Sequence, residues 1–393
     1  IFLLIMLAVF TFTFTCGEPF VKLIDFFFTR LASGLGALWP DSTLPLLKAL
    51  VLEGVIGGVG GVLMFLPNIL LLFLAIAFLE GTGYMSRAAF VMDGFMHKFG
   101  LHGKSFIPML LGFGCTVPAV MATRTIESER DRITTILILP LMSCSARLTI
   151  YLLFIPTFFV ERWQPIVLWI VYLLGAAIAL GGAVLLKSTL FKGDDEVFVM
   201  ELPPYRPPRL LQTLYTSLID RTLVVLWRAV VFALPAGAVI WLTANITVAD
   251  RSLAEWLIAG LHPLGVLIGL NGVILLAYIV AIPANEIVIP TVLMLTVLAM
   301  PAAGPGVGAG VMFELGSAME TEAVLRAGGW TLLTGINLML FSLLHNPCST
   351  TIFTIYKETG SAKWTAVATF LPLALGVIVC FVVAQVTRLL GVL

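Results

Sequence analysis

Long apolar runs alternate with short polar connections along this chain. A helix needs roughly 20 residues to cross a bilayer, and runs close to or above that length cover residues 1–16, 56–79, 133–158, 165–186, 222–245, 331–356 and 364–390. The pattern predicts an all-α polytopic membrane protein. Charged residues at near-helical spacing predict amphipathic helices along the membrane surface over residues 18–45, 84–98 and 250–263.

Two further apolar stretches contain helix breakers. They are residues 104–123, with Gly112, Gly114 and Pro118, and about 266–299, with a break at 282–286 and another at Pro290. In hydrocarbon an unpaired backbone group costs several kcal/mol, so such breaks occur where the backbone lines a cavity or is covered by protein. We therefore expect seven to eight transmembrane helices plus two broken or re-entrant hairpins.

The distribution of basic residues constrains the topology. They gather in three places, namely Arg87 to Lys104, the loop 124–132 and the loop 187–221. The positive-inside rule assigns all three to the cytoplasm. The first two flank segment 104–123, so a simple crossing there would put one of them outside. A re-entrant hairpin with its tip near Gly114 and Cys115 removes the conflict.

The second half of the chain repeats this arrangement. The hairpin at Cys115 precedes a span broken at residues 140–145, and the hairpin at 283–286 precedes a span broken at 345–350. Paired interrupted segments indicate inverted repeats around a midplane transport site. We accordingly divide the chain into N-terminal helices (1–79), a first repeat (80–187), a cytoplasmic loop (188–221) and a second repeat with the C-terminal helix (222–393).

Composition narrows the class further. The chain is 60% hydrophobic and 11% charged, whereas soluble domains are about 25% charged. Its formal net charge is zero and it has no basic tract, so we expect no nucleic-acid partner. The apolar start without an initiating Met reads as a fragment rather than a signal peptide. Five cysteines without a CxxC pair argue against a disulfide framework or a zinc knuckle.

Three cysteines are candidate metal ligands. Cys115, Cys144 and Cys348 each sit at a helix break. Thiolate is a soft ligand that suits late or borderline divalent first-row metals. The alternative is that a cysteine in a membrane helix is a small apolar packing residue, and we adopt it for Cys16 and Cys380, which lack a break nearby.

Ionisable groups within apolar segments are the other candidates. Glu286 lies at the tip of the second hairpin, and Glu80 ends an apolar run, where it could equally mark the membrane interface. Arg147, one turn beyond Cys144, either favours the thiolate or pairs with a carboxylate to hold the helix bundle together, and we favour the structural role. His345 is the histidine that adjoins a break.

Catalytic and nucleotide-binding motifs are missing from the sequence. It has no Gly-x-x-x-x-Gly-Lys-Ser/Thr, no Gly-x-Gly-x-x-Gly after a strand, no Ser-x-x-Lys and no His-Glu-x-x-His. We therefore predict that the chain is not an enzyme. If a nucleotide supplies energy, its site lies outside this chain.

Several motifs resemble the membrane domain of the FeoB family of bacterial ferrous iron transporters. They occupy residues 78–90, 103–108, 112–119, 121–124, 140–147, 285–288, 346–351, 357–361 and 363–364. The resemblance covers nearly the whole chain and is weakest over 190–260 and 300–330. In that family the two halves are called Gate motifs and are similar to those of nucleoside-type transporters. Gly81 departs from the family pattern, in which an acidic residue commonly follows the glutamate.

The resemblance implies a function and partners. It implies Fe²⁺ as the transported substrate, the bacterial inner membrane as the location, and Cys115, Cys144 and Cys348 as the thiols of the iron path. It also implies a preceding cytosolic GTPase domain, through which alone GTP would act, and small accessory Feo proteins. Membrane lipid surrounds such a domain, and self-association into a homo-oligomer is left open.

Our leading hypothesis is a ferrous iron permease in which Cys115, Cys144, Cys348, Glu286 and Glu80 line the ion route. The first alternative is a Gate-type transporter of a nucleoside-like solute, which needs Asn, Gln, Glu and Ser at both hairpin tips. One tip is Gly-Cys-Thr, which favours metal. An enzyme with Cys348 as nucleophile and the neighbouring histidine as base, and a membrane anchor without transport activity, are weaker alternatives.

Overall fold

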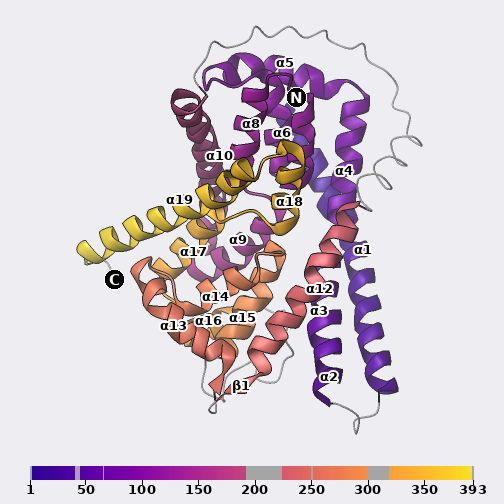
Figure 1. The fold of residues 1–393 in the computed structure, drawn as a ribbon, viewed down its shortest axis with the longest axis vertical. Helices are drawn as coiled ribbons and strands as arrows, with labels where there is room; N and C mark the ends of the chain where they lie inside the picture. The colour runs from indigo at the N-terminus through magenta and orange to yellow at the C-terminus, as the bar shows by residue number, and fades with distance from the viewer. Residues whose placement is uncertain are drawn as a thin grey trace.

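The computed structural model describes residues 2–39, 45–64, 66–191, 224–248, 251–298 and 318–391. Helices fill these ranges, and the strands β1 (Thr247–Val248) and β2 (Arg251–Ser252) form a short antiparallel ribbon. The predicted all-α class is confirmed. Figure 1 shows α5, α6 and α8 at one end of the molecule, β1 and α13 at the other, and α9 and α17 between them.

The first half is built from short and long helices in succession. They are α1 (Phe2–Leu38), α2 (Pro45–Ala49), the π-helix η1 (Leu50–Ile56), α3 (Gly57–Leu63), α4 (Leu66–Gly81), α5 (Tyr84–His97), η2 (Gly103–Ser105), α6 (Phe106–Gly112), α7 (Thr116–Ala122), η3 (Thr123–Thr125), α8 (Glu129–Ile138), η4 (Leu139–Leu141), α9 (Ser145–Phe158), η5 (Glu161–Trp163) and α10 (Gln164–Thr189).

The second half follows the same order of long, broken and long elements. They are α12 (Val224–Asn245), α13 (Leu253–Leu267), α14 (Gly272–Val280), η7 (Asn285–Ile287), α15 (Val288–Leu298), α16 (Ala318–Ala327), α17 (Leu332–Leu344), α18 (Ser349–Thr359) and α19 (Ala362–Leu389). Most of the predicted cytoplasmic loop 188–221 lies outside the described residues.

Within the described ranges, five helical segments are long and apolar enough to cross a membrane, or six if the pair α13 and α14, bent by 110°, counts as one span. The five are Leu47–Gly81, Glu129–Phe158, Glu161–Thr189, Leu332–Thr359 and Ala362–Leu389. The predicted count of seven to eight is thus approximate. Of the predicted spans, 222–245 contains an apolar helix too short for this criterion, Val230–Asn245, and 1–16 belongs to α1, which is not among the five; Asn285–Leu298 is a short apolar helix of the second hairpin.

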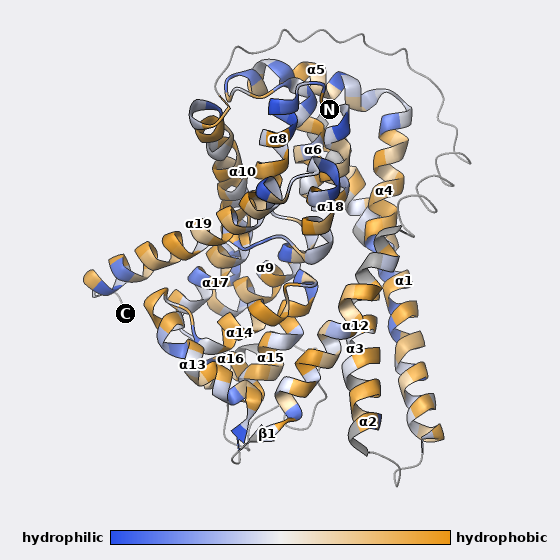
Figure 2. Ribbon diagram, viewed as in Figure 1, coloured by the Kyte–Doolittle hydropathy of each residue, from blue (hydrophilic) through white to orange (hydrophobic). Residues whose placement is uncertain are grey.

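The broken spans lie inside the protein and the unbroken ones outside. In the most apolar windows of Glu129–Phe158 and Leu332–Thr359, 67% and 72% of residues are buried, against 22% in those of α10 and α19. Figure 2 shows apolar residues along α4, α12 and α19 and hydrophilic residues around α8 and α18. The protein cover that a break at membrane depth requires is therefore present.

The first hairpin consists of two helices of seven residues each, α6 and α7, which pack against each other. At 1.5 Å per residue each helix is about 10 Å long, too short to cross a bilayer, as the hairpin prediction requires. A Cβ at Gly114 would lie 2.1 Å from Cδ2 of Leu72 on α4, so a larger residue at the tip requires the Leu72 side chain to shift.

The proline assignments need correction. Pro118 and Pro290 are each the third residue of a helix, α7 and α15 respectively, and break neither. A proline in the first turn is tolerated because its missing N–H has no intrahelical acceptor there. The breaks within the stretch 266–299 lie between α13 and α14 and between α14 and η7, and neither is at Pro290.

Two segments predicted as membrane-surface helices belong to helices that extend beyond them. Residues 18–38 continue the first apolar run in the single helix α1, which passes through Pro19 without ending. Residues 253–263 belong to α13, which forms the bent apolar pair with α14. Segment 84–98 is helical as predicted and forms α5 (Tyr84–His97), while its position along the membrane surface stays a prediction.

Contacts between the halves come in matched pairs. The first-half helix α7 packs on α18, and α9 packs on η7 of the second half. In the same way α10 packs on α17 and α19 on α8. Such reciprocal contacts between corresponding helices are expected of two related repeats around a shared axis. The repeat boundaries at 80–187 and 222–393 stay a prediction.

Glycines bring the N-terminal helices against α12. A Cβ at Gly237 would lie 2.2 Å from the carbonyl oxygen of Gly54, and one at Gly58 would lie 3.0 Å from the Cα of Gly237. Helix pairs in membranes use such small residues because apolar surface alone drives little association there.

Gly237→Ala is expected to lower the thermal unfolding midpoint of the purified protein, because the added methyl group has no room. Overpacking typically costs about 1–3 kcal/mol. Gly260→Ala in α13 is the matched control, since nothing lies within 4 Å of its added Cβ and alanine favours a helix over glycine. Equal midpoints for the two variants would contradict the close approach of α12.

Candidate functional site

A small cavity lies where the broken elements of both halves meet. Its volume is about 40 Å³, and its lining includes Cys115, Cys144, Glu286 and Cys348. Four of the five predicted site residues therefore come together. The fifth, Glu80, is exposed at the end of α4 and is not part of this lining.

The thiols occupy equivalent local positions. Cys115, Cys144 and Cys348 are the residues immediately before α7, α9 and α18, and each has extended backbone. None of the three side chains caps its own helix, although the Cys348 sulfur lies 3.2 Å from the hydroxyl of Thr351. Three helix N-termini thus present a cysteine sulfur to the same cavity. The helix dipoles there favour the negatively charged thiolate form of the cysteine.

Serines that follow two of the thiols fasten the hairpins. Ser145 donates from its backbone N–H (3.1 Å) and its hydroxyl (2.8 Å) to the carbonyl oxygen of Gly114. Ser349 donates in the same two ways, at 3.1 and 3.2 Å, to the carbonyl of Ile282. Sequence reasoning missed these serines, although the Cys-Ser pair shared by both breaks was a signal for them.

Arg147 joins the two breaks. Its side chain is 3% exposed and donates to four carbonyl oxygens, those of Pro140 (3.0 Å), Met142 (3.1 Å), Leu343 (2.9 Å) and His345 (2.8 Å). The first two acceptors belong to the first half and the last two to the second half. The favoured structural role of Arg147 is confirmed, with carbonyls in place of the expected carboxylate.

Oxygen ligands adjoin the thiols. Glu286 and Asn285 in η7 both line the cavity, and the buried Oδ1 of Asn285 makes no hydrogen bond within the described residues. Within the described residues as a whole, no three His, Cys, Asp or Glu side chains are grouped closely enough to hold a metal ion. The cavity therefore offers soft and hard ligands around a small space without forming a closed cage.

His345 does not act on Cys348 as a base would. Its ring packs on Tyr278 (centroids 4.6 Å apart) and on Phe341 (5.2 Å), and its carbonyl accepts from Arg147. Among the residues that line the cavity, His345 is not included. This placement gives no support to the idea of a nucleophilic cysteine enzyme.

Fold and cavity together define a polytopic membrane protein whose two halves place broken helices around one buried site. The Gate family model, described as nucleoside recognition, matches residues 62–158 and 226–362. The model for the C terminus of ferrous iron transport protein B matches residues 168–220. The chain therefore belongs to the Gate family, among its FeoB-type proteins, and it is a multi-pass protein of the inner membrane.

Its relatives are considerably longer. The chain is 34% identical to an Fe(2+) transporter FeoB of Campylobacter jejuni and 36% identical to one of Staphylococcus aureus; each match covers 99% of this chain but 63% and 57% of the relative. A Porphyromonas gingivalis relative, 34% identical, is named as a fusion of Fe(2+) transport protein A with FeoB. The chain thus spans about three fifths of the first two relatives. No solved structure matches it significantly.

Proposed function

We propose that this chain is the permease part of a GTP-dependent transporter that takes up Fe²⁺ across the bacterial inner membrane. One observation supports this most: Cys144 and Cys348 of the two most buried spans meet Cys115 and Glu286 of the two hairpins at one small cavity. The longer relatives are named Fe(2+) transporters. Glu80 remains part of the proposal as a residue nearer the end of the route.

The ligand set suits a transported ferrous ion. Fe²⁺ takes mixed sulfur, nitrogen and oxygen ligands, and an ion that must leave again needs a site that binds it loosely. Thiols bind metal as thiolates, so Fe²⁺ entry releases protons. Arg147 and the helix N-termini beside the cavity then offset the negative charge that the thiolates bring.

The alternative is a nucleoside-like solute, which the description of the Gate family favours. The size of the cavity opposes it. Small-molecule sites usually measure about 300–1,000 Å³, whereas this one measures about 40 Å³, enough for one or a few water-sized ligands. An ion fits this space without a large rearrangement of the hairpins.

We further propose that GTP acts through a domain outside this chain, and that accessory Feo proteins assist. The relatives extend well beyond the matched region, and the natural fusion with Fe(2+) transport protein A supports a working association between the two. The inverted repeats at 80–187 and 222–393 belong to the same proposal, since they would present equivalent breaks from opposite sides.

Uptake of radiolabelled Fe²⁺ and of a radiolabelled nucleoside tests the substrate class directly. Cells without their own ferrous transporter, expressing the chain with its GTPase domain, are expected to accumulate Fe²⁺ under reducing conditions and to take up no additional nucleoside. Cells expressing the GTPase domain alone are the control. Nucleoside accumulation with unchanged Fe²⁺ uptake would reverse the assignment.

A further inference from the structure

The helices that carry two of the thiols run on together beyond the cavity. α7 begins after Cys115 and α18 after Cys348, and the two helices pack against each other. Both lead toward the basic loop 124–132, which the positive-inside rule places in the cytoplasm. The α7–α18 interface therefore connects the cavity with the cytoplasmic end of the protein.

Polar side chains follow this interface. On α18, Thr350, Thr354 and Glu358 recur at every fourth residue and are each at most 9% exposed, so they share one buried face of the helix. On the other side of the interface, Thr116 lines the cavity and the buried Thr123 follows the last turn of α7. A buried carboxyl group is unusual within a membrane span and indicates a route for a polar species, whereas the hydroxyls of Thr354 and Thr123 donate to the carbonyl oxygens of Thr350 and Val120 in their own turns.

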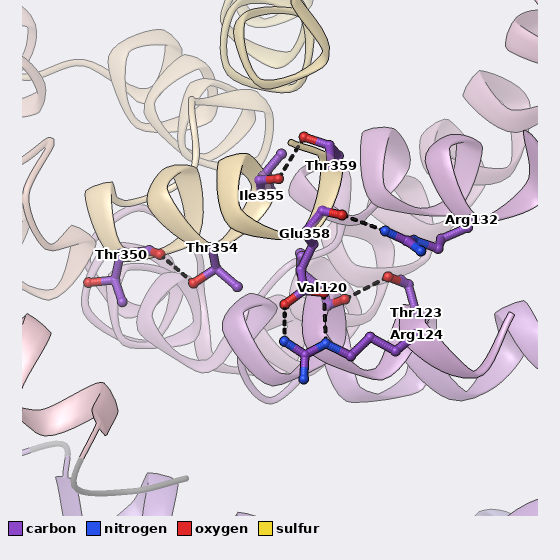
Figure 3. A network of polar contacts seen from close by, with 9 residues as sticks. All are labelled: Val120, Thr123, Arg124, Arg132, Thr350, Thr354, Ile355, Glu358 and Thr359. Atoms are coloured by element: carbon purple, nitrogen blue, oxygen red, sulfur yellow. Dashed lines mark hydrogen bonds and ion pairs between the residues drawn. The ribbon is translucent and has the colours of Figure 1, made fainter. Parts of the chain in front are cut away.

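The interface ends at an ion pair between the two halves. Arg124 holds the Glu358 carboxylate with both prongs of its guanidinium, Nη2 at 2.5 Å from Oε1 and Nε at 2.8 Å from Oε2 (Figure 3). Arg132 donates to the carbonyl oxygen of the same glutamate. The Glu358 side chain is 6% exposed and that of Arg124 is 57% exposed. The bond to Glu358 raises the pKa of Arg124 above its ordinary value, so the guanidinium stays charged.

The equivalent position in the other half is different. Glu358 lies ten residues after Cys348, and the residue ten after Cys144 is Phe154. Phe154 is buried and stacks on Trp330, with ring centroids 5.5 Å apart. Ten residues beyond the thiols of the two equivalent breaks, α18 therefore carries an ion pair and α9 carries an aromatic stack.

We propose that the α7–α18 interface is the cytoplasmic exit of the ion route and that Glu358 is its gate carboxylate, held shut by Arg124. Opening the route separates α7 from α18 and breaks this pair, which would leave a buried carboxylate without its cation. A departing divalent cation replaces the guanidinium there, so the gate opens when an ion arrives and closes behind it. The proposal rests on the proposed transport function and adds the residues that control release.

Thiol accessibility tests the gate without any iron. Inside-out membrane vesicles of the protein are treated with a membrane-impermeant alkylating reagent, and modification of each cysteine is followed by mass spectrometry. Arg124→Gln is expected to speed modification of Cys115 and Cys348 about tenfold, because the interface loses hydrogen bonds to a charged group. The charge-swapped double variant R124E/E358R is expected to restore slow modification, which would assign the effect to the ion pair rather than to either residue alone.

Glu127→Gln is the matched control. It removes an ion pair of similar length at the same end, Lys104 to Glu127 at 2.7 Å, that lies wholly within the first half, and it is expected to leave the modification rates unchanged. Rates in Arg124→Gln equal to those in Glu127→Gln would overturn the gate. So would an equal increase in right-side-out vesicles, because the exit would then not face the cytoplasm.

Measurements of Fe²⁺ transport distinguish the role of Arg124 from that of Glu358. Arg124→Gln retains the gate carboxylate and is expected to transport at no less than the wild-type rate, whereas Glu358→Gln loses the carboxylate and falls at least about tenfold. Equal losses in the two variants would overturn the role of Glu358. If the chain carries no Fe²⁺ at all, the thiol measurement still decides whether this interface is a gate, so the two failures are distinguishable.

Discussion

Replacing Arg147 with Met is expected to prevent folded protein from accumulating in the membrane. The guanidinium is the shared donor to four carbonyl oxygens at the two helix breaks. Methionine is of similar length but donates nothing, so these carbonyls would lose a charged partner in the buried centre of the protein. Removing one member of a buried charged network typically costs about 3–5 kcal/mol, a large part of the stability of most proteins.

The effect is measured as the yield of monodisperse protein and as its thermal unfolding midpoint. Arg162→Met is the matched control, since Arg162 is exposed between α9 and α10. Arg147→Lys is expected to fall between the two, because a lysine keeps the charge but lacks the planar fork that reaches both halves. If Arg147→Met unfolds at the same temperature as Arg162→Met, the carbonyl network does not hold the halves together.

The sequence revealed the breaks and the thiols because both are local signals. Glycine and proline interrupt an apolar run visibly, and a cysteine beside each interruption is apparent without any knowledge of the fold. The positive-inside rule assigned the basic residues on both sides of segment 104–123 to the cytoplasm, which required a hairpin with its tip near Gly114. The short helices α6 and α7 form that hairpin. The convergence of Cys115 and Cys348 followed from treating the halves as repeats.

Interactions between distant residues were beyond the reach of this reasoning. The partners of Arg147 in the second half lie nearly 200 residues away along the chain, and those of Arg124 lie farther still. A buried arginine that binds carbonyls has no sequence signature that separates it from one that binds a carboxylate. Pro290 was misjudged for a related reason, since whether a proline breaks or begins a helix depends on where the preceding turn ends.

Serine in place of Cys115, Cys144 or Cys348 is expected to lower Fe²⁺ transport at least about tenfold per site. The change replaces sulfur by oxygen at nearly constant size, but the hydroxyl does not ionise near neutral pH and is a poor ligand for Fe²⁺. Folding is expected to persist, because none of the three thiols caps a helix. Uptake of radiolabelled Fe²⁺ with the GTPase domain attached, normalised to protein in the membrane, is the measurement.

The other two cysteines provide the controls. Cys380 is buried in α19 and its thiol donates to the carbonyl oxygen of Asn337 at 3.4 Å, so Cys380→Ser should change stability more than transport. Cys16 lies on α1, away from the cavity lining, and Cys16→Ser should change neither. Transport at the wild-type rate in all three cavity variants would exclude a thiol route. Equal losses in the cavity and control variants would instead assign the cysteines to packing, so only a selective loss supports a site built from sulfur at matching breaks.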